Sequence, residues 1–320
     1  VKADLEKLEV IASISAEDIY KAEEDSDIAD VLKTMPKWNP NGRAMLPLTD
    51  DWAEHIEDLK SFHRTNGYGM FAKFVAFTWR NEEFVPITAI DSIRLTDLKN
   101  YEVQRGKVVD NTVAFISDLP ANNVLLYGDR GTGKSSTVHA ILNEYKNRGV
   151  RMIEISKGDI NDLTMIREKI SDSPMKFIIF IDDLSFDNHD DSFGELKAAL
   201  EGSLSGRQNN TLIYATSNRR HLIKENFSDR ENDVNRSDTL QEELSLSDRF
   251  GLSITFINPD KKDFEDIVQK IATDRGLKSD MEKILFTAEQ WARRRGGRSP
   301  RCARQFIDYV ESCEKRNIEW

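Results

Sequence analysis

Residues 128–135 read GDRGTGKS and match the whole pattern G-x-x-x-x-G-K-[ST] of a phosphate-binding loop. A short apolar run at 123–127 precedes the loop and predicts a buried strand. Residues 136–148 follow the loop and predict a helix that ends at Gly149. In this order, glycine backbone N–H groups and the positive end of a helix surround a phosphate. The sequence therefore predicts that the chain binds ATP or GTP.

We expect different residues of this loop to bind the phosphates and the metal ion of a nucleotide. Lys134 is expected to reach the β- and γ-phosphates, and the Ser135 hydroxyl is expected to bind Mg²⁺. The other residues are expected to surround the phosphates. The predicted contacts are Gly128, Asp129, Arg130, Gly131, Thr132, Gly133, Lys134, Ser135 and Ser136.

The composition is that of a soluble globular protein with a strongly acidic balance. The chain has 320 residues, 32% of them charged, and a net charge of −11. This balance argues against a surface coated with basic groups for nonspecific nucleic-acid binding. No apolar stretch is long enough to cross a membrane, and the charged first residues lack the core of a signal peptide. We therefore expect no membrane contact.

The chain has two cysteines, Cys302 and Cys313. On one helix they would lie about 16 Å apart along its axis, which is too far for a disulfide. We expect free thiols without a redox or metal role. Free thiols are typical of a reducing compartment, so the predicted location is the cytoplasm.

Strands and helices alternate between residues 86 and 260. Continuous apolar runs of this kind are typical of buried strands in a parallel sheet. After the strand that precedes the loop, strands are expected at 151–156, 176–181, 211–216 and 252–257, with a helix at 193–202. The predicted fold class is α/β, a three-layer P-loop NTPase domain with a parallel sheet.

The segments that flank this domain are expected to be helical. In residues 1–85, helices are expected at 4–14, from a capping box at 15–18, and at 52–63. The apolar stretch 70–79 is expected to pack in a core. Near the other end, helices are expected at 262–275, 279–295 and 299–316.

Three domains follow from these patterns. The predicted domains are an N-terminal helical region at 1–85, an α/β nucleotide-binding domain at 86–260 and a C-terminal helical lid at 261–320. Within the second domain, the highly charged residues 222–245 are expected to form an exposed insertion.

Polar side chains follow two of the predicted strands. Asp182 and Asp183 come directly after the strand at 176–181, at the sheet edge where ligands bind in open α/β folds. Asp182 is expected to hold Mg²⁺, and Asp183 is expected to polarise the attacking water. Asn218 follows the next strand and is expected to orient that water. The alternative for Asn218 is an ordinary turn at a strand end.

Arginines form a second group of candidates. Arg249 could stabilise the γ-phosphate of a neighbouring subunit as an arginine finger, or form a surface ion pair with Asp248. A cluster surrounds Gly296 and Gly297 and consists of Arg293, Arg294, Arg295, Arg298, Arg301 and Arg304. Three interpretations of this cluster are open. It could be a solvated basic turn, it could supply one arginine that contacts the nucleotide, or it could bind the phosphate backbone of nucleic acid.

Taken in order, these motifs resemble an AAA+ ATPase over roughly residues 90–320. The resemblance implies Walker A at the phosphate loop, Walker B at Asp182 and Asp183, and sensor 1 at Asn218. It also implies an arginine finger at Arg249 and sensor 2 at Arg301. Residues 97–102 (DLKNYE) resemble the segment that packs near the adenine, which adds Tyr101 to the nucleotide contacts.

Two features relate the chain to particular AAA+ groups. Most members carry Glu where this chain has Asp183, and the Asp-Asp pair is similar to the branch of replication initiators, helicase loaders and transposition helpers. The DNA-binding appendages of that branch are not recognisable in residues 1–85. The segments 121–136, 181–186 and 214–222 resemble a bacterial family of uncharacterised ATP-binding AAA+ proteins.

The leading hypothesis is an ATPase that uses ATP and Mg²⁺ and works as a homo-oligomer on an unknown protein partner. One alternative is a slow conformational switch set by the bound nucleotide. A second is a DNA-associated, loader-like ATPase, so nucleic acid remains an open partner. A third is a P-loop kinase for a small molecule, which Asn218 and the helical lid argue against.

Overall fold

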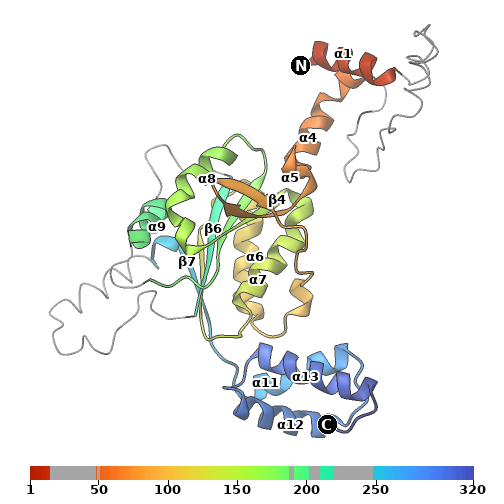
Figure 1. The fold of residues 1–320 in the computed structure, drawn as a ribbon, viewed down its shortest axis with the longest axis vertical. Coiled ribbons are helices and arrows are strands. Elements are labelled where there is room, and N and C mark those ends of the chain that lie inside the picture. Colours follow the sequence, from red (N-terminus) through yellow and green to blue (C-terminus); the bar gives the residue numbers. More distant parts are fainter. Residues whose placement is uncertain (15–47, 49–50, 187–190, 202–209, 219–247) are drawn as a thin grey trace, which may run out of the picture. The chain divides into compact units, whose positions relative to one another are not determined.

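The computed structural model describes residues 1–14, 48, 51–186, 191–201, 210–218 and 248–320 (Figure 1). These residues form two compact units, Val1–Lys73 and Phe74–Trp320. The smaller unit contains α1 (Lys2–Ser13), η1 (Trp52–His55), α4 (Ile56–Asn66) and α5 (Met70–Lys73). The helices expected at 4–14 and 52–63 are present, whereas the capping box at 15–18 lies outside the described residues.

The larger unit is built on a seven-stranded sheet. Its strands are β1 (Ala76–Arg80), β2 (Glu83–Pro86), β3 (Val124–Gly128), β4 (Val150–Ile155), β5 (Lys176–Ile181), β6 (Thr211–Ser217) and β7 (Leu252–Phe256). They lie in the order β2-β1-β4-β5-β6-β3-β7, and every pair is parallel except β1 with β2. The predicted parallel sheet is confirmed, with all five expected strands within about one residue of their predicted bounds.

The hairpin of β1 and β2 corrects the expectation that residues 1–85 are helical throughout. Phe77 and Trp79 are buried, as expected for a core stretch, but they lie on a strand that pairs with β4. Asn81 and Glu82 form the turn, and both have positive φ angles, 50° and 61°. A two-residue turn of this kind normally carries glycine, so its sequence gave no hairpin signal.

Helices cover both faces of the sheet, which confirms the three layers. They are α6 (Glu102–Ile116), α7 (Lys134–Tyr145), α8 (Leu163–Ile170) and α9 (Asp191–Glu201), with short 3₁₀ turns at η2 (Leu95–Asp97), η3 (Lys146–Arg148) and η4 (Lys157–Asp162). In Figure 1, α6 and α7 lie on one side of the sheet, and α8 and α9 lie on the other. The core under α6 and α7 includes Val108, Phe115, Val138, Ile141 and Phe180.

Three helices follow β7 and enclose a core of their own. They are α11 (Lys261–Asp274), α12 (Met281–Arg294) and α13 (Pro300–Lys315), and their core includes Phe264, Ile267, Ile284, Phe306 and Val310. Each helix begins at a side chain that accepts a backbone N–H three residues on, which is the preferred N-cap arrangement. These caps are Asp260, Asp280 and Ser299.

The remaining expectations concern the two cysteines, the insertion, the domain boundaries and the membrane. Cys302 and Cys313 are free and buried on α13, as predicted. The insertion at 222–245 lies outside the described residues. The division into three domains stays a prediction, because compactness divides the described chain once, after Lys73. None of the described helices is both long and apolar enough to span a membrane.

Candidate functional site

The phosphate loop joins β3 to α7 and is fixed against the end of β7. The Asp129 amide donates to the Phe256 carbonyl at 2.8 Å, and the Asp129 carboxylate accepts from the Asn258 amide at 2.7 Å. Gly128 has a φ of 125°, and a Cβ there would lie 2.1 Å from the Phe256 oxygen. Only glycine fits this approach, so the first glycine of the motif is required by packing against β7.

Lys134 lies at the base of the loop with its side chain almost fully enclosed. It is 5% exposed, and its Nζ donates to Gly128 O at 3.0 Å, Asp129 O at 2.7 Å and Asn218 Oδ1 at 3.1 Å. Burial lowers the pKa of Lys134, and the nearby carboxylates of Asp129, Asp183 and Asp182 oppose that shift. An ammonium group has three protons, so all of them are engaged. A phosphate that binds Lys134 must replace at least one of these acceptors.

Asp182 follows β5 and receives two hydroxyl groups. Ser135 Oγ donates to Asp182 Oδ1 at 2.6 Å, and Thr216 Oγ1 donates to the same oxygen. The predicted magnesium ligands Ser135 and Asp182 therefore lie together. The sequence interpretation missed Thr216, although β5 and β6 pair Ile181 with Ala215 and so bring the next residues, Asp182 and Thr216, side by side.

Asp183 has an unusual backbone conformation. Its φ is 51°, in the left-handed region that aspartate tolerates better than most residues. Its amide donates to Thr216 Oγ1 at 2.9 Å, and its Oδ1 accepts from Asn218 Nδ2 at 2.7 Å. Asn218 therefore connects Lys134 on one side with Asp183 on the other. Thr216 fixes both aspartates through one hydroxyl.

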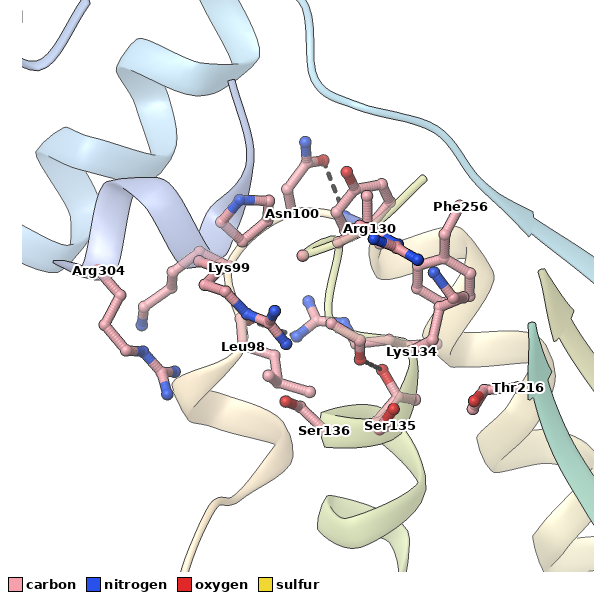
Figure 2. Close-up of a pocket in the computed structure, with 18 of the residues that line it drawn as sticks. Leu98, Lys99, Asn100, Arg130, Lys134, Ser135, Ser136, Thr216, Phe256 and Arg304 are labelled. Atoms are coloured by element: carbon pink, nitrogen blue, oxygen red, sulfur yellow. Dashed lines mark hydrogen bonds between the residues drawn. The ribbon is translucent and has the colours of Figure 1, made fainter. Parts of the chain in front are cut away.

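These groups line a cavity of about 520 Å³, shown in Figure 2. The side of the cavity opposite the sheet is formed by α11 and α13, which contribute Ile267, Ile271, Pro300, Arg301 and Arg304. The Arg301 amide donates to Gly131 O at 3.1 Å, so the start of α13 contacts the phosphate loop. Arg301, a predicted nucleotide contact, thus lines the cavity together with Arg304.

Tyr101 also lines the cavity, at the N-terminus of α6. Its hydroxyl donates to Ile257 O at 2.6 Å, and its ring centroid lies 5.1 Å from that of Phe256. Burial, with smaller effects from Asp129 and Asp263, raises the pKa of this phenol. Because the hydroxyl is engaged with the backbone, the ring is the part of Tyr101 that can contact a ligand.

Arg105 is a further cavity residue that the sequence interpretation missed. Its guanidinium donates to Leu95 O at 3.1 Å and to Leu98 O. It therefore supports the segment 95–101 that forms one wall of the cavity. A lone arginine inside a helix gives no sequence signal for this role.

Some predicted residues lie elsewhere. Gly128, Asp129 and Arg249 are not among the residues that line the cavity. Gly128 and Asp129 anchor the loop from behind, as described above. Arg249 lies half-buried at the start of the segment before β7, next to the fully buried Phe250.

The arginine cluster is divided among several local contacts. Arg293 and Arg298 bind Glu289, and Arg301 and Arg304 line the cavity. The guanidinium of Arg295 lies 4.2 Å from the ring centroid of Trp291. The cluster is therefore not a continuous patch of unengaged cations.

Comparisons with known proteins agree with this arrangement. Residues 72–314 match the family described as "Protein of unknown function (DUF815)". The chain belongs to this family. The DUF815 chain is also 30% identical over 145 residues to the probable mitochondrial chaperone BCS1-A of Dictyostelium discoideum, which covers 37% of this chain and 34% of that protein. It spans about a third of that relative's length.

Among solved structures, the Thermotoga maritima RuvB Holliday junction branch migration motor is similar to this DUF815 chain. The two are 16% identical, with 71% of this chain and 67% of that chain covered and a TM-score of 0.48. The chain is a member of the AAA+ ATPase superfamily, as its motifs predicted. Its own sheet, with the phosphate loop between β3 and α7, has the P-loop NTPase fold.

Proposed function

We propose that this protein binds ATP with Mg²⁺ in the described cavity and hydrolyses it to ADP and phosphate. One observation carries the proposal. Lys134, Asp182, Asp183 and Asn218 come from the ends of adjacent elements and share one hydrogen-bond network at the cavity. A structural ion pair would need fewer groups, and connected polar residues that converge in a cavity are typical of functional sites.

The loop supplies the phosphate site. Gly131 and Gly133 have φ angles of 76° and 94°, and such left-handed glycines allow a loop to turn its N–H groups toward a bound anion. The N-terminus of α7 adds the positive end of a helix. Lys134 would exchange the Gly128 and Asp129 carbonyls for phosphate oxygens, which carry more negative charge and bind an ammonium more strongly.

The residues beside Lys134 suit a magnesium ion. Ser135 Oγ and Asp182 Oδ1 are hard oxygen donors 2.6 Å apart at the cavity wall. They would hold the ion, which supplies neutralisation of the charge on the β- and γ-phosphates. Thr216 would keep the Asp182 carboxylate oriented toward Ser135.

Asp183 and Asn218 would handle the attacking water. The water oxygen forms a bond to the γ-phosphorus while the bond to the β–γ bridging oxygen breaks, and a proton passes to the Asp183 carboxylate. Asn218 orients that carboxylate by its hydrogen bond of 2.7 Å. Arg301 and Arg304 would meet the negative charge that develops on the phosphates.

Asp183→Asn tests this function most directly. The amide keeps the shape of the side chain but accepts a proton poorly, so we expect ATP binding near the wild-type level and turnover lower by about 10²-fold or more. Lys134→Ala is expected to lose ATP binding itself. Wild-type turnover in Asp183→Asn would overturn the assignment of Asp183.

A slow nucleotide-dependent switch is the second candidate. The hydrogen bonds present without nucleotide favour it, because ATP must displace acceptors from Lys134. Asn218 contacts both Lys134 and Asp183, so a change at Lys134 is passed to Asp183 through Asn218. The side chain of aspartate is also shorter than that of glutamate, so the Asp183 carboxylate would lie farther from the attacking water. Asp183→Glu with raised turnover would support the switch, and unchanged or lowered turnover would favour the ATPase.

The assembly and the partner complete the proposal. We infer a homo-oligomer in which Arg249 contacts the nucleotide of a neighbouring subunit, acting on a protein partner of unknown identity. A nucleic-acid partner is less favoured, because Arg293, Arg295 and Arg298 are engaged within the chain, and Arg301 and Arg304 line the cavity. The cytoplasmic location remains a prediction from the free cysteines.

A further inference from the structure

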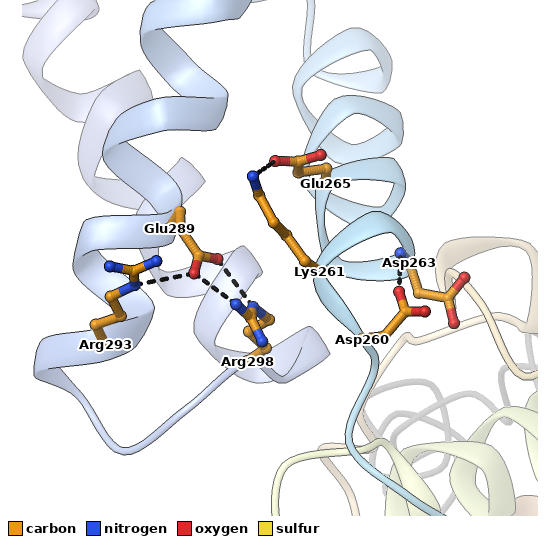
Figure 3. Close-up of polar contacts among 7 residues, drawn as sticks. All are labelled: Asp260, Lys261, Asp263, Glu265, Glu289, Arg293 and Arg298. Atoms are coloured by element: carbon orange, nitrogen blue, oxygen red, sulfur yellow. Dashed lines mark hydrogen bonds and ion pairs between the residues drawn. The ribbon is translucent and has the colours of Figure 1, made fainter.

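Glu289 on α12 is a buried carboxylate outside the nucleotide cavity, and Figure 3 shows its partners. It is 8% exposed and accepts from Arg298 Nε at 2.9 Å and from Arg298 Nη2 at 2.7 Å. Arg293 Nε adds a third contact at 3.1 Å. A two-bond arginine–carboxylate pair fixes orientation as well as distance, so Arg298 is held in one direction relative to α12.

Arg298 lies in the turn between α12 and α13, where the Gly297 amide donates to Ala292 O at 2.9 Å and ties the chain to the end of α12 as far as Gly297. Gly296 and Gly297 precede it with φ angles of 90° and 119°, and a Cβ at either position would meet nothing within 4 Å. Glycines have many accessible conformations, so the direction in which the chain leaves Gly297 toward α13 depends on a further restraint. The Glu289–Arg298 pair supplies that restraint directly after the glycines.

The fixed turn leads straight to the phosphate loop. Ser299 caps α13 by accepting from the Cys302 amide at 3.2 Å. The Arg301 amide donates to Gly131 O at 3.1 Å, and Arg301 and Arg304 line the cavity. Arg298 is three residues from Arg301, so a change in its position moves the start of α13 relative to the loop.

We propose that the Glu289–Arg298 ion pair positions the start of α13, so that Arg301 and Arg304 face the bound nucleotide. Both members are positioning residues that act through Arg301 and Arg304. The proposal rests on the proposed ATP site, since it assigns a cause to the placement of two of its residues. In the protein without nucleotide, the same pair maintains the hydrogen bond from the Arg301 amide to Gly131 O.

The first test measures ATP affinity by calorimetry in Arg298→Ala and in the matched control Arg293→Ala. Arg293 contacts the same carboxylate but belongs to α12 and does not constrain the turn. We expect ATP binding to weaken by about tenfold in Arg298→Ala and by less than about twofold in the control. Arg298→Lys, which keeps the charge but offers no paired bonds, should fall between them. Equal affinity in Arg298→Ala and wild type would overturn the proposal.

A mutant cycle in the background Arg301→Ala/Arg304→Ala separates positioning from general stability. If Arg298 acts through these two arginines, adding Arg298→Ala to that background weakens ATP binding no further. Fully additive losses would contradict this route. If Arg298→Ala does not fold, the cycle is run with Arg298→Lys and with Glu289→Gln, and the same two outcomes decide.

Hydrogen exchange without nucleotide distinguishes failure of this proposal from failure of the proposed function. The Arg301 amide should exchange at least about tenfold faster in Arg298→Ala than in wild type, with no such change in Arg293→Ala. Unchanged exchange overturns the positioning role. Faster exchange in a protein whose wild type binds no ATP would uphold the positioning role and reject the proposed function.

Discussion

Asn218 and Asp183 are joined by a hydrogen bond of 2.7 Å from the amide nitrogen to the carboxylate, while the amide oxygen of Asn218 accepts from Lys134. The same side chain thus contacts the residue that would bind phosphate and the residue that would activate water. Occupancy of the phosphate site and the orientation of Asp183 are physically linked through this amide.

Asn218→Ala should therefore separate binding from chemistry. Without the amide, Asp183 loses its orienting donor, and turnover is expected to fall by about 10²-fold, while ATP affinity changes by less than about fivefold. Steady-state turnover and calorimetric ATP binding check both parts. Turnover equal to that of wild type would assign Asn218 to an ordinary strand-end turn.

Thr216 offers a matched pair of substitutions. Thr216→Val keeps the shape but removes the hydroxyl that serves Asp182 and the Asp183 amide, and the site is only 2% exposed. Leaving the Asp183 amide unpaired is expected to cost about 1–3 kcal/mol in the free energy of unfolding, and the loss of one donor to Asp182 is expected to raise the Mg²⁺ concentration needed for turnover. Thr216→Ser should keep both properties near wild type. Equal behaviour of the two variants in urea titrations and Mg²⁺ titrations would contradict this role.

Replacement by alanine is expected to have opposite effects on stability at two glycines, Gly128 and Gly106. Gly128→Ala places a methyl group 2.1 Å from Phe256 O at a φ of 125°, so we expect a loss of more than about 3 kcal/mol. Gly106 lies inside α6, and a Cβ there would meet nothing within 4 Å. Gly106→Ala is expected to stabilise the protein by about 0.5–1 kcal/mol. Urea unfolding measures both, and similar midpoints for the two variants would contradict the strain at Gly128.

Sequence reasoning located the residues whose signal is local. Lys134, Asp182 and Asn218 each follow a glycine loop or an apolar strand, and strand ends of a parallel sheet meet at one edge, so their convergence could be predicted. Thr216, Arg105 and Glu289 were missed, because their roles depend on partners that no motif marks: Asp182 on the neighbouring strand, the Leu98 carbonyl and Arg298.

The hairpin at 76–86 was missed for a related reason. Its turn, Asn81 and Glu82, adopts positive φ angles without a glycine, and tertiary pairing with β4 decides its conformation. An apolar run alone does not distinguish a strand from a helix. The sequence therefore predicted the five strands from β4 to β7 along the sheet and missed the edge formed by β1 and β2.

The Glu289 pair gives stability a defined dependence on pH. Hydrogen bonds from Arg298, with a smaller contribution from Arg293, lower the pKa of Glu289 against the effect of burial. A carboxylate whose pKa is lower in the folded state stabilises the fold above its unfolded pKa of about 4.3. This contribution is lost as the pH falls from there through the folded pKa.

The free energy of unfolding should therefore be larger for wild type than for Glu289→Gln at pH 7, and this difference should shrink below about pH 4.3. Urea unfolding of both proteins between pH 7 and pH 3 measures it. Arg293→Ala serves as the control, since it leaves the two bonds from Arg298 in place. A difference that stays constant across this range would show that Glu289 acts by packing and not by its charge.

Arg249 tests the proposed assembly, because a residue that acts on a neighbouring subunit can be supplied by another polypeptide. Arg249→Ala and Asp183→Asn should each be nearly inactive alone. In an equimolar mixture, an Arg249→Ala subunit keeps Asp183, and an Asp183→Asn subunit keeps Arg249. Random pairing around a head-to-tail ring then gives about one complete site in four, so turnover should recover to about a quarter of wild type.

Turnover of the wild type should also rise per subunit with protein concentration, and it should be measured with and without single-stranded and duplex DNA. Complementation without an effect of DNA would support an oligomer that acts on a protein partner, and stimulation by DNA would favour the loader-like role. Wild-type turnover in Arg249→Ala alone would contradict an action in trans and leave the ion pair with Asp248 as its role. An inactive mixture of two folded variants would place Arg249 within its own subunit's chemistry.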